Sequence, residues 1–206
     1  MKIEFFHRKG GTILLAKQDV EVRIVDFSPK YLREMVELGN ERFGENYTNE
    51  SKMRAYAENE NNICKLAIDT KEDKLIGFFL MHGTNISGLA KEFKLRIDEI
   101  KNFIGYNEKI CVAKSLALQK NSENGGIATE LVRESLEKAK RMGFYSSWSP
   151  LWIRKNGSIP AKHVIERNGY LFYKNVHMLW VDDKNYKCLD CAGPCKCDAA
   201  IYYKIL

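Results

Sequence analysis

Residues 110 to 142 read ICVAKSLALQKNSENGGIATELVRESLEKAKRM, and they contain the clearest secondary-structure patterns of the chain. Ile110 to Leu118 is almost entirely apolar or small, which is typical of a strand buried on both faces. Gly126 to Met142 places its apolar side chains on one stripe, as an amphipathic helix does, and Gly143 ends it. The stretch therefore predicts a central strand that runs through a polar, glycine-containing loop into a helix.

The loop from Gln119 to Gly125 and the helix start form a candidate anion site. The first backbone N–H groups of a helix have no partner within it, and the helix dipole favours negative charge there. Gly125 and Gly126 have no Cβ, so a bulky ligand can approach their backbone. The loop lacks both the Lys-Ser/Thr ending of a P-loop and the spacing of a dinucleotide fingerprint. On this segment alone, phosphate binding and a plain helix start both stay open.

Hydrophobic periodicity predicts the elements on either side of this stretch. We expect strands at 20–25, 63–68, 74–82, 146–153, 170–181 and 199–205, and helices at 30–43, 48–58, 89–103 and 158–168. This order predicts an α/β (α+β) fold, in which helices pack on the faces of a mixed sheet. The sequence shows no internal repeat and no Gly/Ser linker, so we expect a single domain over residues 1–206.

The composition excludes several classes of protein. With 206 residues, 45% hydrophobic and 29% charged, the chain is neither disordered nor collagen-like. No apolar run approaches the roughly 20 residues that a membrane span needs. The N-terminal sequence MKIEFFHRKGG does not resemble a secretory signal, so we expect a cytoplasmic protein with no membrane partner. The net charge of +6 fits an anionic ligand and equally an ordinary solvated surface.

The loop and its neighbours resemble the GNAT superfamily, the acyl-CoA-dependent N-acetyltransferases. Their signature, Gln/Arg-x-x-Gly-x-Gly/Ala, lies between the fourth strand and the following helix, and here it falls on ENGGIA, residues 123–128. Gly126 and Ala128 match, whereas Glu123 stands where Gln or Arg is usual. The element order from Val20 to Val181 is also that of the superfamily, and AKHVIERNGY, residues 161–170, looks like its frequent A-x-x-x-Y-x-x-x-G-F ending. The resemblance implies a mostly antiparallel central sheet of about seven strands.

The resemblance also implies the reaction and the cosubstrate. It implies that acetyl-CoA donates its acyl group directly to a primary amine of an acceptor. Carried over residue by residue, it implies that the cosubstrate is held by Leu116, Ala117, Leu118, Asn124, Gly125, Gly126, Ile127, Ala128 and Thr129. Lys120, Arg133 and Lys162 are further candidates for the phosphates, with solvated surface lysine or arginine as the plain alternative. Because a carboxylate is unfavourable beside a pyrophosphate, we expect Glu123 to point away.

The acid and the base of the reaction are less evident. The family's usual proton-donating Tyr corresponds here to Ile165, which cannot donate a proton. We therefore take Tyr173, just downstream, as the candidate acid and Glu108, just before the central strand, as the candidate base. The missing Tyr also favours a second hypothesis, a non-catalytic acyl-CoA sensor on the same fold. The identity of the acceptor and the presence of a homodimer stay open.

Four of the six cysteines lie within ten residues and form the pattern C-x-x-C-x-x-x-C-x-C: Cys188, Cys191, Cys195 and Cys197. Four thiolates joined by turn residues suit tetrahedral Zn²⁺, so we predict a metal site in a Cys-rich insertion at about 184–198, before the last strand. An iron–sulfur cluster and reduced cysteines without metal stay as alternatives, and disulfides are disfavoured because nothing suggests export. A zinc knuckle would also allow a third function, nucleic-acid binding, but the region lacks a dense stripe of Arg and Lys interleaved with aromatics.

Overall fold

The computed structural model describes residues 12–15, 20–123, 125–184 and 186–206. Its strands are β1 (Thr12–Leu15), β2 (Val20–Asp26), β3 (Gly44–Glu45), β4 (Asn62–Asp69), β5 (Lys74–Thr84), β6 (Ile110–Leu118), β7 (Ser146–Trp152), β8 (Leu171–Val176), β9 (Lys187–Cys188) and β10 (Ala199–Ile205). Its helices are α1 (Leu32–Phe43), α2 (Glu50–Ala57), α3 (Ile86–Phe93), α4 (Ile97–Ile104), α5 (Ile127–Arg141) and α6 (Lys162–Arg167), with 3₁₀ turns η1 (Pro29–Tyr31) and η2 (Lys120–Ser122).

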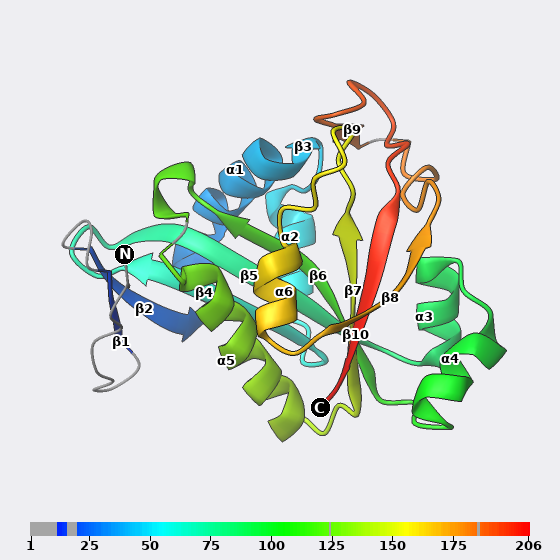
Figure 1. The fold of residues 1–206 in the computed structure, drawn as a ribbon. Coiled ribbons are helices and arrows are strands. Elements are labelled where there is room, and N and C mark those ends of the chain that lie inside the picture. The colour runs from blue at the N-terminus through cyan, green and yellow to red at the C-terminus, as the bar shows by residue number, and fades with distance from the viewer. Residues whose placement is uncertain (1–11, 16–19, 124, 185) are drawn as a thin grey trace, which may run out of the picture.

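One eight-stranded sheet organises the fold, in the order β1-β2-β4-β5-β6-β7-β10-β8 (Figure 1). Its neighbouring strands pair antiparallel, except for β6 and β7, which are parallel. β3 and β9 form a small second sheet. The predicted class, a mixed and mostly antiparallel sheet flanked by helices, is confirmed. The sheet exceeds the expected seven strands because β1, which the sequence analysis did not predict, pairs with β2 at the edge.

Helices cover both faces of the sheet, and β6 lies at its centre (Figure 1). Cys111 and Ala113 pack with α5 in one hydrophobic core. Ile110 and Val112 point to the opposite face and pack with α3 and α4, because alternate side chains of a strand point to opposite faces. A third core joins α1 and α2 to β4 and β5. β6 is therefore buried on both faces, as its apolar sequence predicts.

Three predicted elements differ from the observed ones, each for a local reason. The helix expected at 89–103 is two helices, because Lys94 adopts a left-handed backbone conformation (φ +54°) that ends α3. The strand expected at 170–181 ends at Val176, because Met178 also has a positive φ of +47°. The helix expected at 158–168 begins only at Lys162, because the Ser158 hydroxyl bonds Asn156 instead of capping a helix.

Candidate functional site

The site forms where the two parallel strands of the sheet separate. β6 and β7 pair over only three positions, from Ile110↔Ser146 to Val112↔Trp148, and their register ends there although both strands continue. A cavity of about 280 Å³ lies between the diverging ends. Ala113 to Leu116 of β6 and Ser149 to Trp152 of β7 line it. The parallel pair therefore opens into a cavity in the middle of the sheet.

The cavity is lined from both faces of the sheet. Phe43 and Tyr47, from the end of α1 and the loop after it, contribute from one face. Ala161 and Ile165, at α6, contribute from the other. Two reactants approaching from opposite faces can therefore meet between β6 and β7.

A β-bulge in β6 lies beside this cavity. Leu80 of β5 pairs with Ser115, whereas the next residue, Met81, pairs with Ala113, so Lys114 has no partner in the ladder. The bulge places Lys114 and Ser115 on the cavity lining. Bulges are frequent next to active sites because they re-aim side chains.

The predicted cosubstrate residues of the strand divide between the cavity and the core. Leu116 lines the cavity and is half-buried. Ala117 and Leu118 are buried and pair with Phe78 and Gly77 of β5. Their side chains pack into the cores on opposite faces of the sheet, so only their backbone is available to a ligand in the cavity.

The predicted anion site coincides with the N-terminus of α5. The helix begins at Ile127, and its N-cap, Gly126, has a left-handed conformation (φ +82°) that favours glycine. Among the described residues no side chain caps the helix, so the N–H groups of Ile127, Ala128 and Thr129 have no partner from the cap residue. Gly125 is half-buried beside them. Asn124, also predicted to bind here, lies outside the described residues.

An ion pair between α1 and the loop lies beside this helix start. Glu123 forms a close ion pair with Arg42 of α1, so its carboxylate is neutralised as well as turned toward another element. Arg42 is thus a cation beside the loop that the sequence analysis missed, because 81 residues separate it from Glu123. Of the predicted candidates, Arg133 pairs with Glu130 and Glu134, and Lys162 lies 3.9 Å from Glu166.

The two predicted catalytic residues do not lie among the residues that line the cavity. Tyr173 donates its hydroxyl hydrogen to Glu99 at 3.1 Å and packs with Phe103 near α4; burial, and secondarily this bond, raise the pKa of Tyr173. Glu108 precedes the paired end of β6, away from the opening, and accepts the backbone N–H of Ile86 at 3.0 Å. Their catalytic roles stay predictions.

The cavity lining instead contains a side-chain hydroxyl, that of Tyr47, which the sequence analysis did not identify as a candidate acid. The hydroxyls of Tyr47 and Ser115 are in close hydrogen-bonding contact at its lining. Burial raises the pKa of Tyr47 to about 12, against a smaller opposing effect of Ser115, so this phenol is neutral and can donate a hydrogen bond at pH 7. Ile165, at the position of the usual family Tyr, lines the same cavity and is 1% exposed. No local sequence pattern marks Tyr47, because it reaches β6 from a loop 68 residues away.

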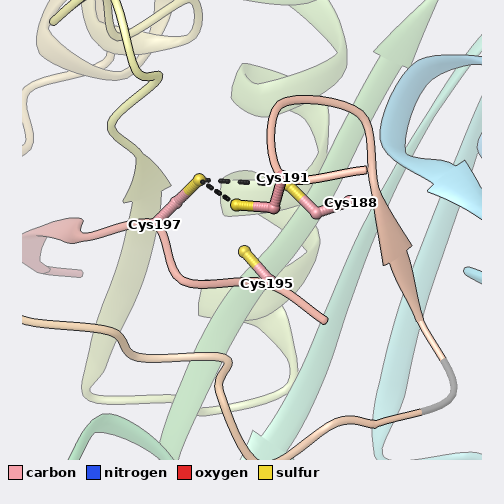
Figure 2. A group of neighbouring side chains, drawn as sticks. All are labelled: Cys188, Cys191, Cys195 and Cys197. Carbon is pink, nitrogen blue, oxygen red and sulfur yellow. Dashed lines mark hydrogen bonds between the residues drawn. The ribbon is translucent and has the colours of Figure 1, made fainter. Parts of the chain in front are cut away.

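The four clustered cysteines converge, as the sequence predicts (Figure 2). Their Sγ atoms all lie within 4.8 Å of one another, with Cys191 and Cys188 at 3.6 and 3.9 Å from Cys197. All four are free thiols, and three of them are buried. We call residues 188–197 the cysteine knuckle.

Neighbouring backbone and side-chain groups lie close to the sulfur atoms of the knuckle. The backbone N–H of Lys196 donates to Cys191 Sγ at 3.4 Å. Burial raises the pKa of Cys197 to about 11. The Trp152 indole N–H is buried and has no hydrogen-bond partner among the described residues. Cys195 and Trp152 also line the cavity, so the knuckle borders the candidate site.

Comparison with solved structures shows that the chain has the GNAT fold. Arabidopsis thaliana NAA60 in complex with acetyl-CoA is 13% identical, with a TM-score of 0.67, and the match covers 90% of this chain and 98% of that one. The NatC complex bound to Gag peptide and CoA gives 13% identity, a TM-score of 0.64 and coverages of 90% and 98%. A GNAT phosphinothricin acetyltransferase from Sinorhizobium meliloti in complex with AcCoA gives 15%, 0.60, 90% and 88%.

The likeness to known proteins is one of fold and not of sequence. No protein-family model matches the chain, and no curated protein sequence matches it. In the part of the chain that the structure describes, no helix is long and apolar enough to cross a membrane.

Proposed function

We propose that this chain, which has the GNAT fold, transfers an acetyl group from acetyl-CoA to a primary amine. The observation that carries the proposal is the cavity between the diverging ends of β6 and β7, lined from both faces of the sheet. The similar folds of NAA60 and the phosphinothricin acetyltransferase, both solved with acetyl-CoA, support the choice of cosubstrate.

In the proposed reaction the neutral amine attacks the thioester carbonyl carbon and a C–N bond forms. The tetrahedral intermediate then collapses, the C–S bond breaks, and the electron pair leaves with the sulfur as CoA thiolate. The nitrogen loses one proton and the thiolate gains one, so an amide and a free thiol are the products. The reaction needs no covalent enzyme intermediate and no redox partner.

The acetyl-CoA end of the site lies at β6 and α5. Backbone N–H groups at Ile127, Ala128 and Thr129 suit the pyrophosphate, because they combine unpaired donors with the positive end of the helix dipole. The backbone from Leu116 to Leu118, beyond the last pair with β7, suits the amide groups of the pantetheine arm. Arg42 neutralises the Glu123 carboxylate, which would otherwise place an unpaired negative charge beside the phosphates.

At the reacting end, we assign Tyr47 as the group that stabilises the departing thiolate. Its hydroxyl lies at the cavity lining on Ser115, next to the bulge of β6. Because its pKa is raised to about 12, Tyr47 keeps its proton and donates a hydrogen bond to the sulfur as charge develops there. The final proton on the thiol is the one that the amine releases.

We further propose that the cysteine knuckle binds one Zn²⁺ ion. Four thiolates at the usual Zn–S length of about 2.3 Å have sulfurs about 3.8 Å apart, and the Sγ atoms already lie within 4.8 Å of one another. The unpartnered indole N–H of Trp152 beside Cys197 fits a thiolate, which is a better acceptor than a thiol. A bound ion would hold the knuckle together; metal analysis of protein purified under reducing conditions tests this.

The test of the enzymatic proposal has two arms. In the first, acetyl-CoA at about 100 times its Kd is expected to stabilise the protein by about 2.7 kcal/mol, which is about 5–10 °C in Tm for a chain of this size. In the second, release of free CoA thiol is measured over a panel of amino acids, peptides and arylalkylamines. Absence of any acetyl-CoA stabilisation would overturn the proposal, and binding without thiol release for any amine would instead point to a sensor.

A further inference from the structure

The segment between β8 and β10 has very little regular structure for its length. It runs from His177 to Asp198, and the only strand among its described residues, β9, has two residues. Loops longer than about 12–15 residues without secondary structure are uncommon in compact proteins and are usually either functional or disordered. Something other than a backbone ladder must therefore hold this segment in place.

The interior of the segment is a small cluster built on sulfur. Cys188, Cys195 and Cys197 form its buried centre, and Trp152, Trp180 and Tyr186 pack around them. Its buried cysteines belong to none of the three larger hydrophobic cores, and Trp180 links the cluster to the core at α3 and α4. Burying so few apolar side chains offsets only a small part of the conformational entropy that is lost when the segment becomes ordered.

The residues that cover the sulfurs also form one wall of the cavity. Trp152, Trp180, Tyr186 and Cys195 belong both to the sulfur cluster and to the cavity lining. Asp183, from the same segment, lines the cavity too. We call these five residues the acceptor wall, because they line the cavity, whereas the helix start that suits the pyrophosphate does not.

The segment also positions Tyr47. β9 pairs with β3 through Gly44↔Cys188 and Glu45↔Lys187. The Tyr186 hydroxyl donates to the Phe43 carbonyl at 2.6 Å, and the Tyr186 ring meets the Tyr47 ring edge-on at 6.3 Å. A displacement of the knuckle would therefore move the loop that carries Tyr47.

Charge around the knuckle suits a bound anionic metal–thiolate group. Zn²⁺ with four thiolates has a net charge of −2. Three cations and one acidic residue line a second depression together with Cys191 and Cys197: Arg154, Lys155, Lys196 and Asp198. Arg154 also holds the knuckle directly, through a two-pronged ion pair with Asp190 at 2.5 and 3.3 Å.

We propose that a Zn²⁺ ion bound by the four cysteines holds the acceptor wall and the Tyr47 loop in place, while the acetyl-CoA end of the site forms without it. This inference rests on the proposed function, because the acceptor is the amine substrate of the proposed acetyl transfer. Because structural Zn²⁺ binding supplies folding free energy to the segment that carries its ligands, removing the ion should loosen this segment and leave the rest of the sheet intact.

The experiment compares the full chain loaded with Zn²⁺ to the same chain treated with a chelator and a reductant. Metal content is measured in both, and amide hydrogen exchange is followed by mass spectrometry. We expect peptides from the knuckle and from the α1–α2 loop to exchange at least about tenfold faster without metal. Peptides from β5 and α5 should be unchanged and serve as the internal control for folding.

Two variants and one ligand sharpen the test. Cys191→Ser, which replaces the half-exposed ligand, should reproduce the metal-free exchange pattern, whereas Cys64→Ala, in the core under α1, should not. Acetyl-CoA should bind the loaded and metal-free proteins with similar Kd. Failure to bind Zn²⁺, or unchanged exchange after verified metal loss, would overturn the inference. Failure of acetyl-CoA to bind either form would overturn the proposed function alone, since the exchange result would still decide the role of the metal.

Discussion

A single methyl group at Gly44 should detach the knuckle from the rest of the site. Gly44 joins α1 to the β3–β9 pair and has φ +127° and ψ +167°, a conformation that is almost exclusive to glycine. A Cβ built there would collide with the carbonyl oxygen of Lys187 and lie 3.0 Å from its carbonyl carbon. Both obstacles are backbone atoms, so no side-chain rotation can relieve the clash.

The cost of Gly44→Ala follows from these two terms. Holding a residue other than glycine in this region of φ and ψ costs about 1–3 kcal/mol. The clash adds to it and can be relieved only by opening the β3–β9 pair, which loses backbone hydrogen bonds worth about 1 kcal/mol each. We expect the free energy of unfolding to fall by about 2–4 kcal/mol.

The assay combines urea unfolding with steady-state kinetics. Gly157→Ala is the matched control, because Gly157 also has a positive φ (+79°) but a Cβ there meets nothing within 4 Å. Its cost should be about 1 kcal/mol, with unchanged kinetics. Gly44→Ala should raise the acceptor KM and leave the acetyl-CoA KM near its original value. Equal stability losses in the two variants, together with an unchanged acceptor KM for Gly44→Ala, would contradict a clash between Gly44 and Lys187 that matters for the site.

Three further predictions concern the site and the core. Tyr47→Phe should lower kcat about 100-fold without changing the acetyl-CoA KM, because it removes the proposed hydrogen bond to the thiolate. The control, Tyr106→Phe at an exposed position, should leave kcat unchanged. A fully active Tyr47→Phe variant would refute the assignment. Arg42→Ala should raise the acetyl-CoA KM about tenfold while the acceptor KM stays constant, and an effect on the acceptor alone would contradict a phosphate role. Burial raises the pKa of the Cys64 and Cys111 thiols from near 9 to about 12, so the unfolded chain loses these protons first as pH rises. Stability should therefore fall by about 3 kcal/mol per pH unit above pH 9, and urea unfolding of the Cys64→Ala, Cys111→Ala double variant should show a shallower slope.

The fold was predictable because its central elements have strong local patterns. The apolar run of β6 and the stripe of α5 are long, and their side-chain periods are clear, so both elements lie where the sequence places them. The breaks at Lys94 and Met178 were not predictable, because a positive φ in a residue other than glycine leaves no local signal. Edge strand β1 was missed because its four residues are too few for a periodic pattern.

The site was predictable only where it lies on contiguous sequence. The Gly126 helix start and the cysteine knuckle each occupy about ten residues, and both form as expected. The contacts of Tyr47 with Ser115 and of Arg42 with Glu123 join segments more than 60 residues apart, and only the folded sheet brings them together. Closeness in sequence was not a sufficient guide. Tyr173 follows α6 and Glu108 precedes the central strand, yet neither residue lines the cavity.

A cavity lined from both faces of the sheet also constrains the order of events in the proposed reaction. Each substrate has its own side of the sheet, so neither has to leave before the other enters, and both products can depart in either order. Such an enzyme works through a ternary complex, and initial-rate plots against one substrate at fixed levels of the other should intersect rather than run parallel. The short pairing of β6 with β7, which opens the cavity, therefore predicts sequential kinetics for the proposed reaction.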